Sequence, residues 1–248
     1  MVAIALTYLA LAATVFAPVD RQGAEAAPVT LRSAALGERT EINVVVPAAA
    51  APRGKRPLLV FLHGRGGSEE TFVDNAAVFE GLEALGRRAP VVAFPDGGDH
   101  GYWHDRDDGD WGRYVMREVI PTVSRRFGVE PGRVAIGGIS MGGFGAYDLA
   151  LLHAGRFCAV VEGADFARHD VVGRVRRDPD AFGPIPVWND YGSADPFRAY
   201  DEGFVDYLER GDADLRAHSW RGGHDNDYWN RHWPAYLRFY AGALANCG

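Results

Sequence analysis

The chain has 248 residues, of which 47% are hydrophobic and 24% are charged, and its formal net charge at pH 7 is -7. This length and composition are typical of one globular domain, because α/β folds often reach this size undivided. The negative charge argues against a nucleic-acid-binding protein and against electrostatic docking on an anionic membrane.

The first 26 residues have the composition of a targeting segment. Residues 2–17 are almost wholly apolar, and Ala24-Glu25-Ala26 fits a cleavage site ahead of Ala27. The segment has no Lys or Arg at its start, and it is short for a membrane span, which needs about 20 apolar residues. We expect residues 1–26 to be a cleaved signal peptide, with an uncleaved N-terminal anchor as the alternative. Residues 27–248 are then expected to form a single domain of a secreted or cell-envelope protein.

The first half of the chain is predicted to contribute four strands and one helix. The predicted strands are 29–32, 41–46, 58–62 and 91–94. The first two flank a polar turn at Gly37-Glu38 and are expected to form a hairpin, whereas the last two are apolar runs typical of strands covered on both faces. Residues 71–85 are predicted to be a helix with Ser68 as its N-cap.

The second half alternates between helical and strand-like segments. Residues 114–127 have helical spacing of apolar side chains and are expected to be a helix with a kink at Pro121. After it come a strand at 133–137, a helix at 141–153, strands at 157–161 and 186–191, a helix at 200–210, an edge strand at 215–220 and a helix at 228–244. Strands that alternate with helices predict the α/β class with a mostly parallel central sheet.

A glycine-flanked serine follows the predicted strand at 133–137. Gly138-Ile139-Ser140-Met141-Gly142 stands between that strand and a helix, which is the context in which G-x-S-x-G marks a nucleophile. The sharp turn holds the serine in a strained conformation, and only small neighbours allow the strand and the helix to approach each other. We therefore interpret Ser140 as a nucleophile. The alternative is a glycine-rich turn with a solvated serine.

Functional side chains of a parallel sheet gather at the carboxyl ends of its strands. In this chain Ser140, Asp195 and His224 follow predicted strands in the order of an α/β-hydrolase triad. His224 is predicted to accept the serine proton, and Asp195 is predicted to orient the imidazole. The competing residues are His63 for the base and Asp165 and Asp190 for the acid.

A serine nucleophile also needs backbone donors for the oxyanion that forms on the attacked carbonyl. One predicted donor is the N–H group of Met141, which follows the serine. The other is expected in the early glycine loop, at Arg65 or alternatively at Gly66.

An aromatic and polar loop at residues 98–112 is predicted to lie at the mouth of the site, because aromatic faces suit sugar rings and aryl acids. The alternative is that its aromatic side chains only pack the loop onto the domain. The candidate substrate contacts in this loop and elsewhere are His63, Trp103, His104, Trp111, Tyr228 and Trp229. His63 has a second interpretation, as a structural support of the glycine loop.

No metal or cofactor is expected. The acidic residues between 105 and 110 lack the completing ligands of a Ca²⁺ loop, so we expect a solvated loop, and no CxxC or His/Cys cluster suggests a structural metal. Cys158 lies in a strand-like run and is expected to be buried. A disulfide between Cys158 and Cys247 is allowed in an exported protein, but the sequence does not supply its geometry.

Several motifs resemble one known family. They are residues 61–67 (FLHGRGG), 95–98 (PDGG), 138–143 (GISMGG), 191–195 (YGSAD), 222–225 (GGHD) with Tyr228-Trp229, and Trp111 with 117–121 (REVIP). From Leu58 to the C-terminus the chain resembles the putative esterase family of α/β-hydrolases, which includes esterase D, feruloyl esterases and mycobacterial antigen 85. The resemblance implies an α/β-hydrolase fold and acyl transfer to water without a metal or cofactor.

Two departures from the family pattern narrow the expected activity. His63-Gly64 stands where the mycolyltransferases have Asp-Gly, and the excursion between Ala164 and Pro186 is short, so we expect a short or absent lid. We expect a secreted, monomeric serine esterase that hydrolyses short-acyl, aryl or carbohydrate esters through an acyl-enzyme on Ser140. The alternatives are acyl transfer to a sugar acceptor, as in antigen 85, and a non-catalytic surface-binding protein on a hydrolase scaffold.

Overall fold

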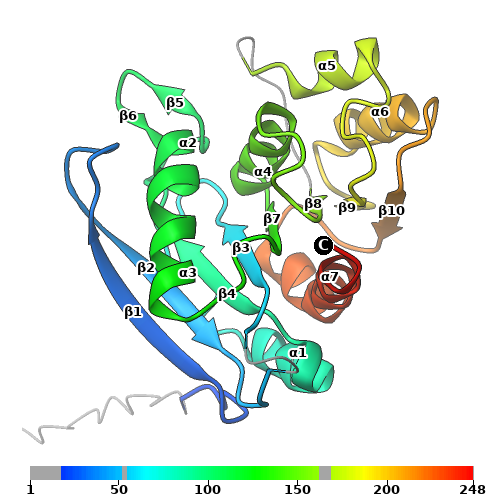
Figure 1. The fold of residues 1–248 in the computed structure, drawn as a ribbon. Helices are drawn as coiled ribbons and strands as arrows, with labels where there is room; N and C mark the ends of the chain where they lie inside the picture. Colours follow the sequence, from blue (N-terminus) through cyan, green and yellow to red (C-terminus); the bar gives the residue numbers. More distant parts are fainter. Residues whose placement is uncertain (1–17, 52–54, 162–168, 248) are drawn as a thin grey trace, which may run out of the picture.

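A mixed β-sheet runs through the molecule in the computed structural model, which describes residues 18–51, 55–161 and 169–247 (Figure 1). Its first part has five strands in the order β1-β2-β4-β3-β7. These are β1 (Glu25–Arg32), β2 (Arg39–Val46), β4 (Val91–Pro95), β3 (Leu58–Leu62) and β7 (Val134–Gly138). β2 is antiparallel to both of its neighbours, whereas β3 pairs in parallel with β4 and with β7.

The sheet continues beyond β7 into the C-terminal half of the chain. The Ile136 N–H donates to the Ala159 carbonyl at 3.2 Å, and the Cys158 N–H donates to the Val134 carbonyl at 2.8 Å. The chain then enters β8, and the parallel order β8-β9-β10 follows. These strands are β8 (Val160–Val161), β9 (Val187–Gly192) and β10 (Leu215–Trp220). The predicted α/β class with a mostly parallel sheet is confirmed.

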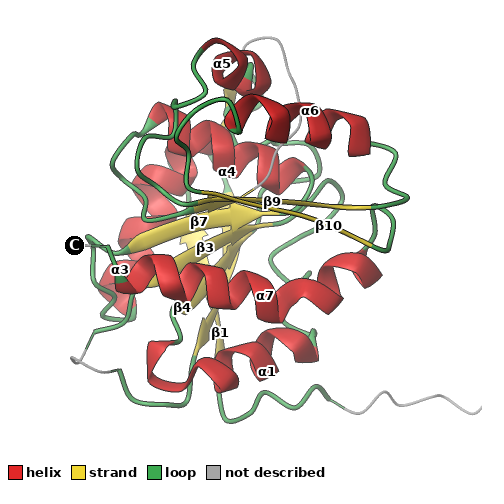
Figure 2. Ribbon diagram, turned by 90° about the vertical axis from the view of Figure 1, so that its right-hand side faces the viewer, coloured by secondary structure: helices red, strands yellow, loops and turns green. Residues whose placement is uncertain are grey.

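Helices cover both faces of the sheet. They are α1 (Ala76–Leu85), α2 (Trp111–Arg113), α3 (Ile120–Arg126), α4 (Met141–Leu152), α5 (Val171–Arg177), α6 (Arg198–Leu208) and α7 (Asn226–Ala245). Figure 2 shows α1 and α7 on one side of the sheet and α4, α5 and α6 on the other. A small hairpin, β5 (Asp105–Arg106) with β6 (Gly109–Asp110), projects from the loop before α2.

Alternate side chains of β3 enter two separate hydrophobic cores, because successive residues of a strand point to opposite faces. Val60 belongs to one core, together with Phe144 of α4. Phe61 belongs to the other, where its ring centroid lies 4.4 Å from that of Trp233 of α7. β3 is buried along its whole length, which is why its sequence is a continuous apolar run.

One predicted helix start and one expected kink differ from the structure. α1 begins at Ala76 rather than at residue 71, because the side chain of Asn75 caps it by accepting a hydrogen bond from the Ala77 N–H at 3.0 Å. The expected kink at Pro121 is instead a π-helical segment, Tyr114–Val119, that directly precedes α3. A proline lacks the N–H group of the helical ladder, and the wider π turn accommodates this loss.

Cys158 and Cys247 form a disulfide in the structure. The bond ties the end of the chain, beyond α7, to the segment that leads into β8. It closes a loop of 89 residues, a connection that the sequence alone left open.

The expected targeting segment lies mostly outside the described residues, which begin at residue 18. The expected boundary after Ala26 falls within β1, whose first residues pair with Val46 and Val45. In the part of the chain that the structure describes, no helix is both long enough and apolar enough to span a membrane.

Candidate active site

Ser140 occupies a strained turn between β7 and α4. Its φ of 51° lies in the left-handed region, which a residue with a side chain seldom adopts. A Cβ atom added at Gly142 would lie 2.1 Å from the Leu62 carbonyl oxygen, and one at Gly138 would lie 2.5 Å from the Gly142 carbonyl oxygen. The two glycines of the motif therefore allow β7, β3 and α4 to meet closely enough to form the turn.

The structure brings Ser140, His224 and Asp195 together. The Nε2 atom of His224 lies 2.9 Å from the Ser140 hydroxyl oxygen, and its Nδ1 atom lies 2.8 Å from an Asp195 carboxylate oxygen. The side chain of Asp195 is 6% exposed and that of His224 is 25% exposed. In this arrangement the imidazole can accept the hydroxyl proton while the carboxylate accepts a hydrogen bond from the Nδ1–H group.

Parallel pairing of β9 with β10 explains how Asp195 and His224 meet. Gly192 pairs with Trp220, so both strands end at the same edge of the sheet. The Ala194 N–H donates to the Gly222 carbonyl at 2.8 Å, and a Cβ atom at Gly192 would lie 2.3 Å from that carbonyl oxygen. The two turns are therefore packed backbone against backbone, with the acid on one and the base on the other.

Asp190 was a competing candidate for the acid, but it lies elsewhere. Its carboxylate is 1% exposed and accepts hydrogen bonds from Trp188 at 2.6 Å, from Tyr228 at 2.7 Å and from Tyr236 at 3.0 Å. Burial raises the pKa of Asp190, and these three donors oppose the shift. Asp190 thus joins β9 to α7. Asp165, the other candidate, lies outside the described residues.

Two backbone N–H groups, those of Met141 and Arg65, are the candidate oxyanion donors. Met141 is the first residue of α4, where an N–H has no carbonyl partner within the helix. The early glycine loop lies against the nucleophile turn, since a Cβ atom at Gly64 would be 3.3 Å from the Cβ of Ser140. The Gly66 N–H already donates to the Asp99 carbonyl at 3.3 Å, which favours Arg65 over Gly66 as the second donor.

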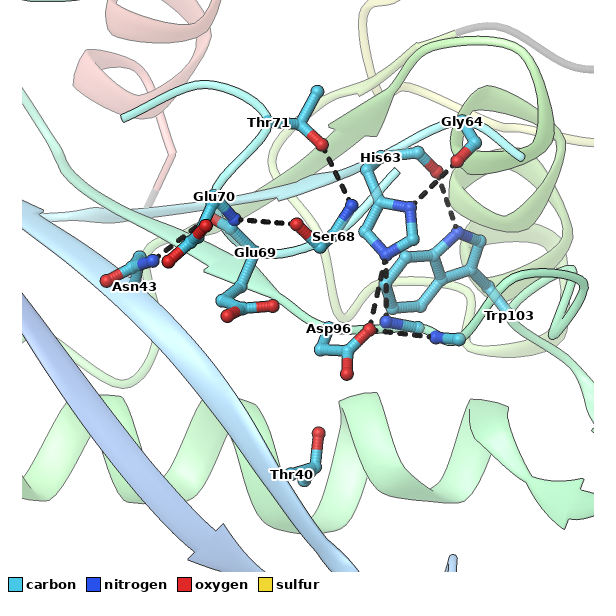
Figure 3. A network of polar contacts seen from close by, with 12 residues as sticks. Thr40, Asn43, His63, Gly64, Ser68, Glu69, Glu70, Thr71, Asp96 and Trp103 are labelled. Atoms are coloured by element: carbon cyan, nitrogen blue, oxygen red, sulfur yellow. Dashed lines mark hydrogen bonds and ion pairs between the residues drawn. The ribbon is translucent and has the colours of Figure 1, made fainter. Parts of the chain in front are cut away.

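His63 and Trp103 support this loop from below (Figure 3). His63 donates from Nδ1 to the Gly64 carbonyl at 2.8 Å, its Nε2 accepts from the Gly97 N–H at 2.9 Å, and Trp103 donates to the His63 carbonyl at 3.2 Å. His63 is 1% exposed and Trp103 is 0% exposed. The substrate contacts expected of these two residues are therefore corrected to structural roles.

Most of the other expected aromatic contacts are also packing residues. Trp111 lies against Gly98 and Gly101, and the Tyr228 hydroxyl is held by Asp190, so both side chains are buried. Trp229 is 8% exposed, and its ring centroid lies 4.9 Å from that of His224. These side chains shape the site without forming its open surface, because the loop at residues 98–112 folds inward.

Phe197 is a candidate substrate contact that sequence reasoning missed. Its ring is 46% exposed, and its centroid lies 4.9 Å from that of His224 in an edge-on arrangement. Its backbone N–H donates to Asp195 at 2.8 Å. The one available signal was its position two residues after the predicted acid.

His104 and Asp201 complete the surroundings. His104 stacks on His169 with ring centroids 4.0 Å apart, and the two hydrogen bonds that link the triad involve neither residue. Burial, together with the charges of Asp195 and Asp190, raises the pKa of Asp201 to about 8. This shift favours the protonated form of Asp201 and so reduces the negative charge beside Asp195.

A family model described as putative esterase matches residues 33–240 of the chain. A putative esterase of Nocardia uniformis subsp. tsuyamanensis is 31% identical over 204 residues, which are 77% of this chain and 56% of that protein. An esterase of Mycobacterium tuberculosis is 28% identical over 173 residues, which are 66% of this chain and 35% of that protein. The chain thus spans about half and about a third of the length of these two relatives.

Solved structures share the fold at lower identity. A ferulic acid esterase superposes with a TM-score of 0.77 at 20% identity, over 89% of this chain and 98% of that one. An S-formylglutathione hydrolase from Agrobacterium tumefaciens superposes with a TM-score of 0.74 at 21% identity, over 90% of this chain and 96% of that one. The neighbours establish the α/β-hydrolase fold.

Proposed function

The chain belongs to the putative esterase family, and from this premise we propose that it is a serine esterase whose catalytic residues are Ser140, His224 and Asp195. The observation that carries the proposal is the pair of hydrogen bonds that links the three side chains, with Ser140 presented on a strained turn. A non-catalytic binding protein would have no need for this arrangement.

The proposed reaction begins when the Ser140 oxygen attacks the ester carbonyl while His224 Nε2 accepts the hydroxyl proton. Asp195 holds the Nδ1–H and stabilises the imidazolium. The N–H groups of Met141 and Arg65 bind the oxyanion, and each such donor typically contributes about 3 kcal/mol to the transition state. His224 then gives its proton to the departing alkoxide, which leaves as the alcohol.

The second half of the reaction releases the acid. His224 takes a proton from water, and the resulting hydroxide attacks the acyl group on Ser140. The same two N–H groups bind the new oxyanion. As it collapses, His224 returns the proton to the Ser140 oxygen, and the carboxylic acid leaves.

The proposed substrates are small carboxylic esters that present an aromatic or sugar ring at the mouth of the site. The half-exposed ring of Phe197 beside His224 supports this class, because aromatic faces stack on such rings. We further propose that the protein is exported. The Cys158–Cys247 disulfide supports export, since disulfides persist in oxidising compartments.

The test compares the wild-type protein with Ser140→Ala and with Ser219→Ala, a matched change of an exposed serine on β10. We expect a fluorophosphonate probe to label the wild-type protein and Ser219→Ala but not Ser140→Ala. Hydrolysis of p-nitrophenyl acetate should fall at least about 10⁴-fold in Ser140→Ala alone. Equal labelling or turnover in Ser140→Ala would refute the nucleophile assignment.

A panel of esters tests the substrate class. It contains p-nitrophenyl esters of increasing chain length, methyl ferulate and acetylated xylan. We expect turnover of the p-nitrophenyl esters to decrease steeply when the acyl chain is longer than butyrate. We also expect methyl ferulate or acetylated xylan to be cleaved. A preference for long acyl chains would contradict the proposed class and leave the nucleophile assignment intact.

A further inference from the structure

Away from the triad, three side chains of the types that bind metal ions lie close together. They are His104, Asp148 and His169. Each offers a ligand atom, and these atoms all lie within 4.8 Å of one another. We propose that this His–Asp–His cluster binds one divalent transition-metal ion, and that Zn²⁺ is the ion its chemistry suits best. The inference does not depend on the proposed esterase function.

The three ligands come from separate segments whose positions are fixed by neighbouring structure. His104 follows Tyr102 and Trp103, which both have positive φ values, and the Trp103 side chain packs tightly against Gly145 of α4. Asp148 lies on α4. His169 directly precedes the N-cap of α5. The cluster thus joins the loop at residues 98–112 to two helices.

The carboxylate of Asp148 is buried beside His169. Asp148 is 1% exposed, and its hydrogen bond in the described structure comes from His169 Nδ1 at 2.7 Å. A carboxylate can accept about four hydrogen bonds, and burying it with fewer is costly. A bound cation would stabilise this buried carboxylate.

His104 presents a ring nitrogen that has no partner in the described structure. Its Nδ1 atom is buried and has no hydrogen-bond partner in the described part of the chain. The ring stacks on His169 with an interplanar angle of 20°. A neutral imidazole with an unpartnered nitrogen can donate the lone pair of that nitrogen to a metal.

The ligand set selects the type of ion. Two imidazoles with one carboxylate suit Zn²⁺ and related transition metals, whereas Ca²⁺ and Mg²⁺ prefer sites built wholly from oxygen. Tetrahedral Zn²⁺ holds its ligand atoms about 3.3 Å apart. The widest pair must therefore close by up to roughly 1.5 Å, and the stacked rings must turn to aim both nitrogens at one ion. A surface cavity of about 280 Å³, lined by His104, His169 and residues 105–108, admits the ion and a water ligand.

The position of the cluster points to a stabilising role. Asp148 follows Ser140 by eight residues along α4, which corresponds to about 12 Å of helix. A metal ion there would not touch the ester. It would hold the loop that carries Trp103, and Trp103 supports the glycine loop beside Ser140.

Isothermal titration with ZnCl₂ tests the site on the full chain carrying His224→Ala, so that the triad histidine cannot bind the ion. His104→Phe and His169→Phe keep the stacked rings but remove nitrogen ligands, and Asp148→Asn keeps the shape. His100→Ala, a change at an exposed histidine, is the matched control.

We expect one equivalent of Zn²⁺ to bind the His224→Ala background and the His100→Ala control. Affinity should fall at least about 100-fold in each cluster variant. Zn²⁺ should also raise the Tm of the background protein but not that of folded His104→Phe. Equal affinity in the background and the cluster variants, absence of Zn²⁺ binding to the background, or tighter binding of Ca²⁺ than of Zn²⁺ would overturn the proposal.

Discussion

Two aromatic rings hold the imidazole of His224 in place. The centroids of Phe197 and Trp229 each lie 4.9 Å from that of His224, but Trp229 is buried and Phe197 is half exposed. Trp229 therefore supports the base from within the domain, whereas Phe197 offers a face to a bound molecule. The ring of Phe197 thus packs against the proposed base and can also contact the substrate.

Phe197→Ala is expected to reduce kcat/KM about tenfold for methyl ferulate relative to methyl butyrate, because the aryl substrate loses a ring contact and the alkyl substrate does not. Phe197→Leu should retain part of the preference. Leu152→Ala, a change at an exposed residue of α4, serves as the control. An unchanged ratio between the two substrates in Phe197→Ala would show that the ring only packs on His224.

The sequence indicates where the proposed catalytic residues meet but not which aromatic side chains are exposed, for a physical reason. The strained turn at Ser140 requires its glycines, and the turns after β9 and β10 must meet because the strands are parallel. The loop at residues 98–112 has no such periodic signal. Whether Trp103 faces solvent or the core depends on space left by Gly97 and by Gly145, and Gly145 is distant in sequence.

At the scale of elements, the buried strand β3 was predicted more accurately than the start of α1. β3 matches its predicted bounds because its apolar run is bordered by Pro57 and His63. Ser68 was the predicted cap of α1, and local propensity did not reveal that Asn75 caps the helix instead. Ser68 instead accepts a hydrogen bond from Glu70 in a turn.

The packing of α6 against the end of β9 has an electrostatic consequence that can be measured. The pKa of Asp201 is raised to about 8 by burial and by Asp195 and Asp190, against about 3.9 in an unfolded chain. Between pH 4 and pH 8 the folded protein holds a proton that the unfolded chain has released. This group therefore makes the free energy of unfolding fall as the pH rises through that range.

Asp201→Asn is expected to stabilise the protein, and more at pH 8 than at pH 5. The gain at pH 8 should be at least about 1 kcal/mol, since one pKa unit corresponds to about 1.4 kcal/mol. Urea unfolding at both pH values measures it. Asp206→Asn, at an exposed position of the same helix, should change little. An equal effect of Asp201→Asn at both pH values would contradict the assigned pKa direction.

At the scale of the whole molecule, one disulfide links distant parts of the chain. The Cys158–Cys247 bond fastens the chain beyond α7 to the segment between β7 and β8. α7 begins directly after His224, so the same helix connects the disulfide to the proposed base. Cysteine positions alone did not reveal this link, because it depends on where α7 ends relative to the sheet.

Cys247→Ser is expected to lower the free energy of unfolding by up to about 4–5 kcal/mol, the chain-entropy value for a loop of this size. Urea unfolding of the oxidised protein, of the same protein with dithiothreitol and of the variant measures the effect. The reductant should destabilise the wild-type protein and leave the variant unchanged. A reductant effect of equal size on both would assign the loss to another cause.

The central claim is that the ester's acyl group is transferred to Ser140. Its most direct test is intact-mass spectrometry with peptide mapping after acid quenching of the full chain during turnover of p-nitrophenyl acetate. The predicted result is a mass increase of one acetyl group that maps to Ser140 and is absent from Ser140→Ala. Two results would contradict the account. One is an acetyl group on another residue that is released at the rate of turnover. The other is turnover by His224→Ala, a variant in which the acyl-enzyme should accumulate, without an acetyl group on Ser140.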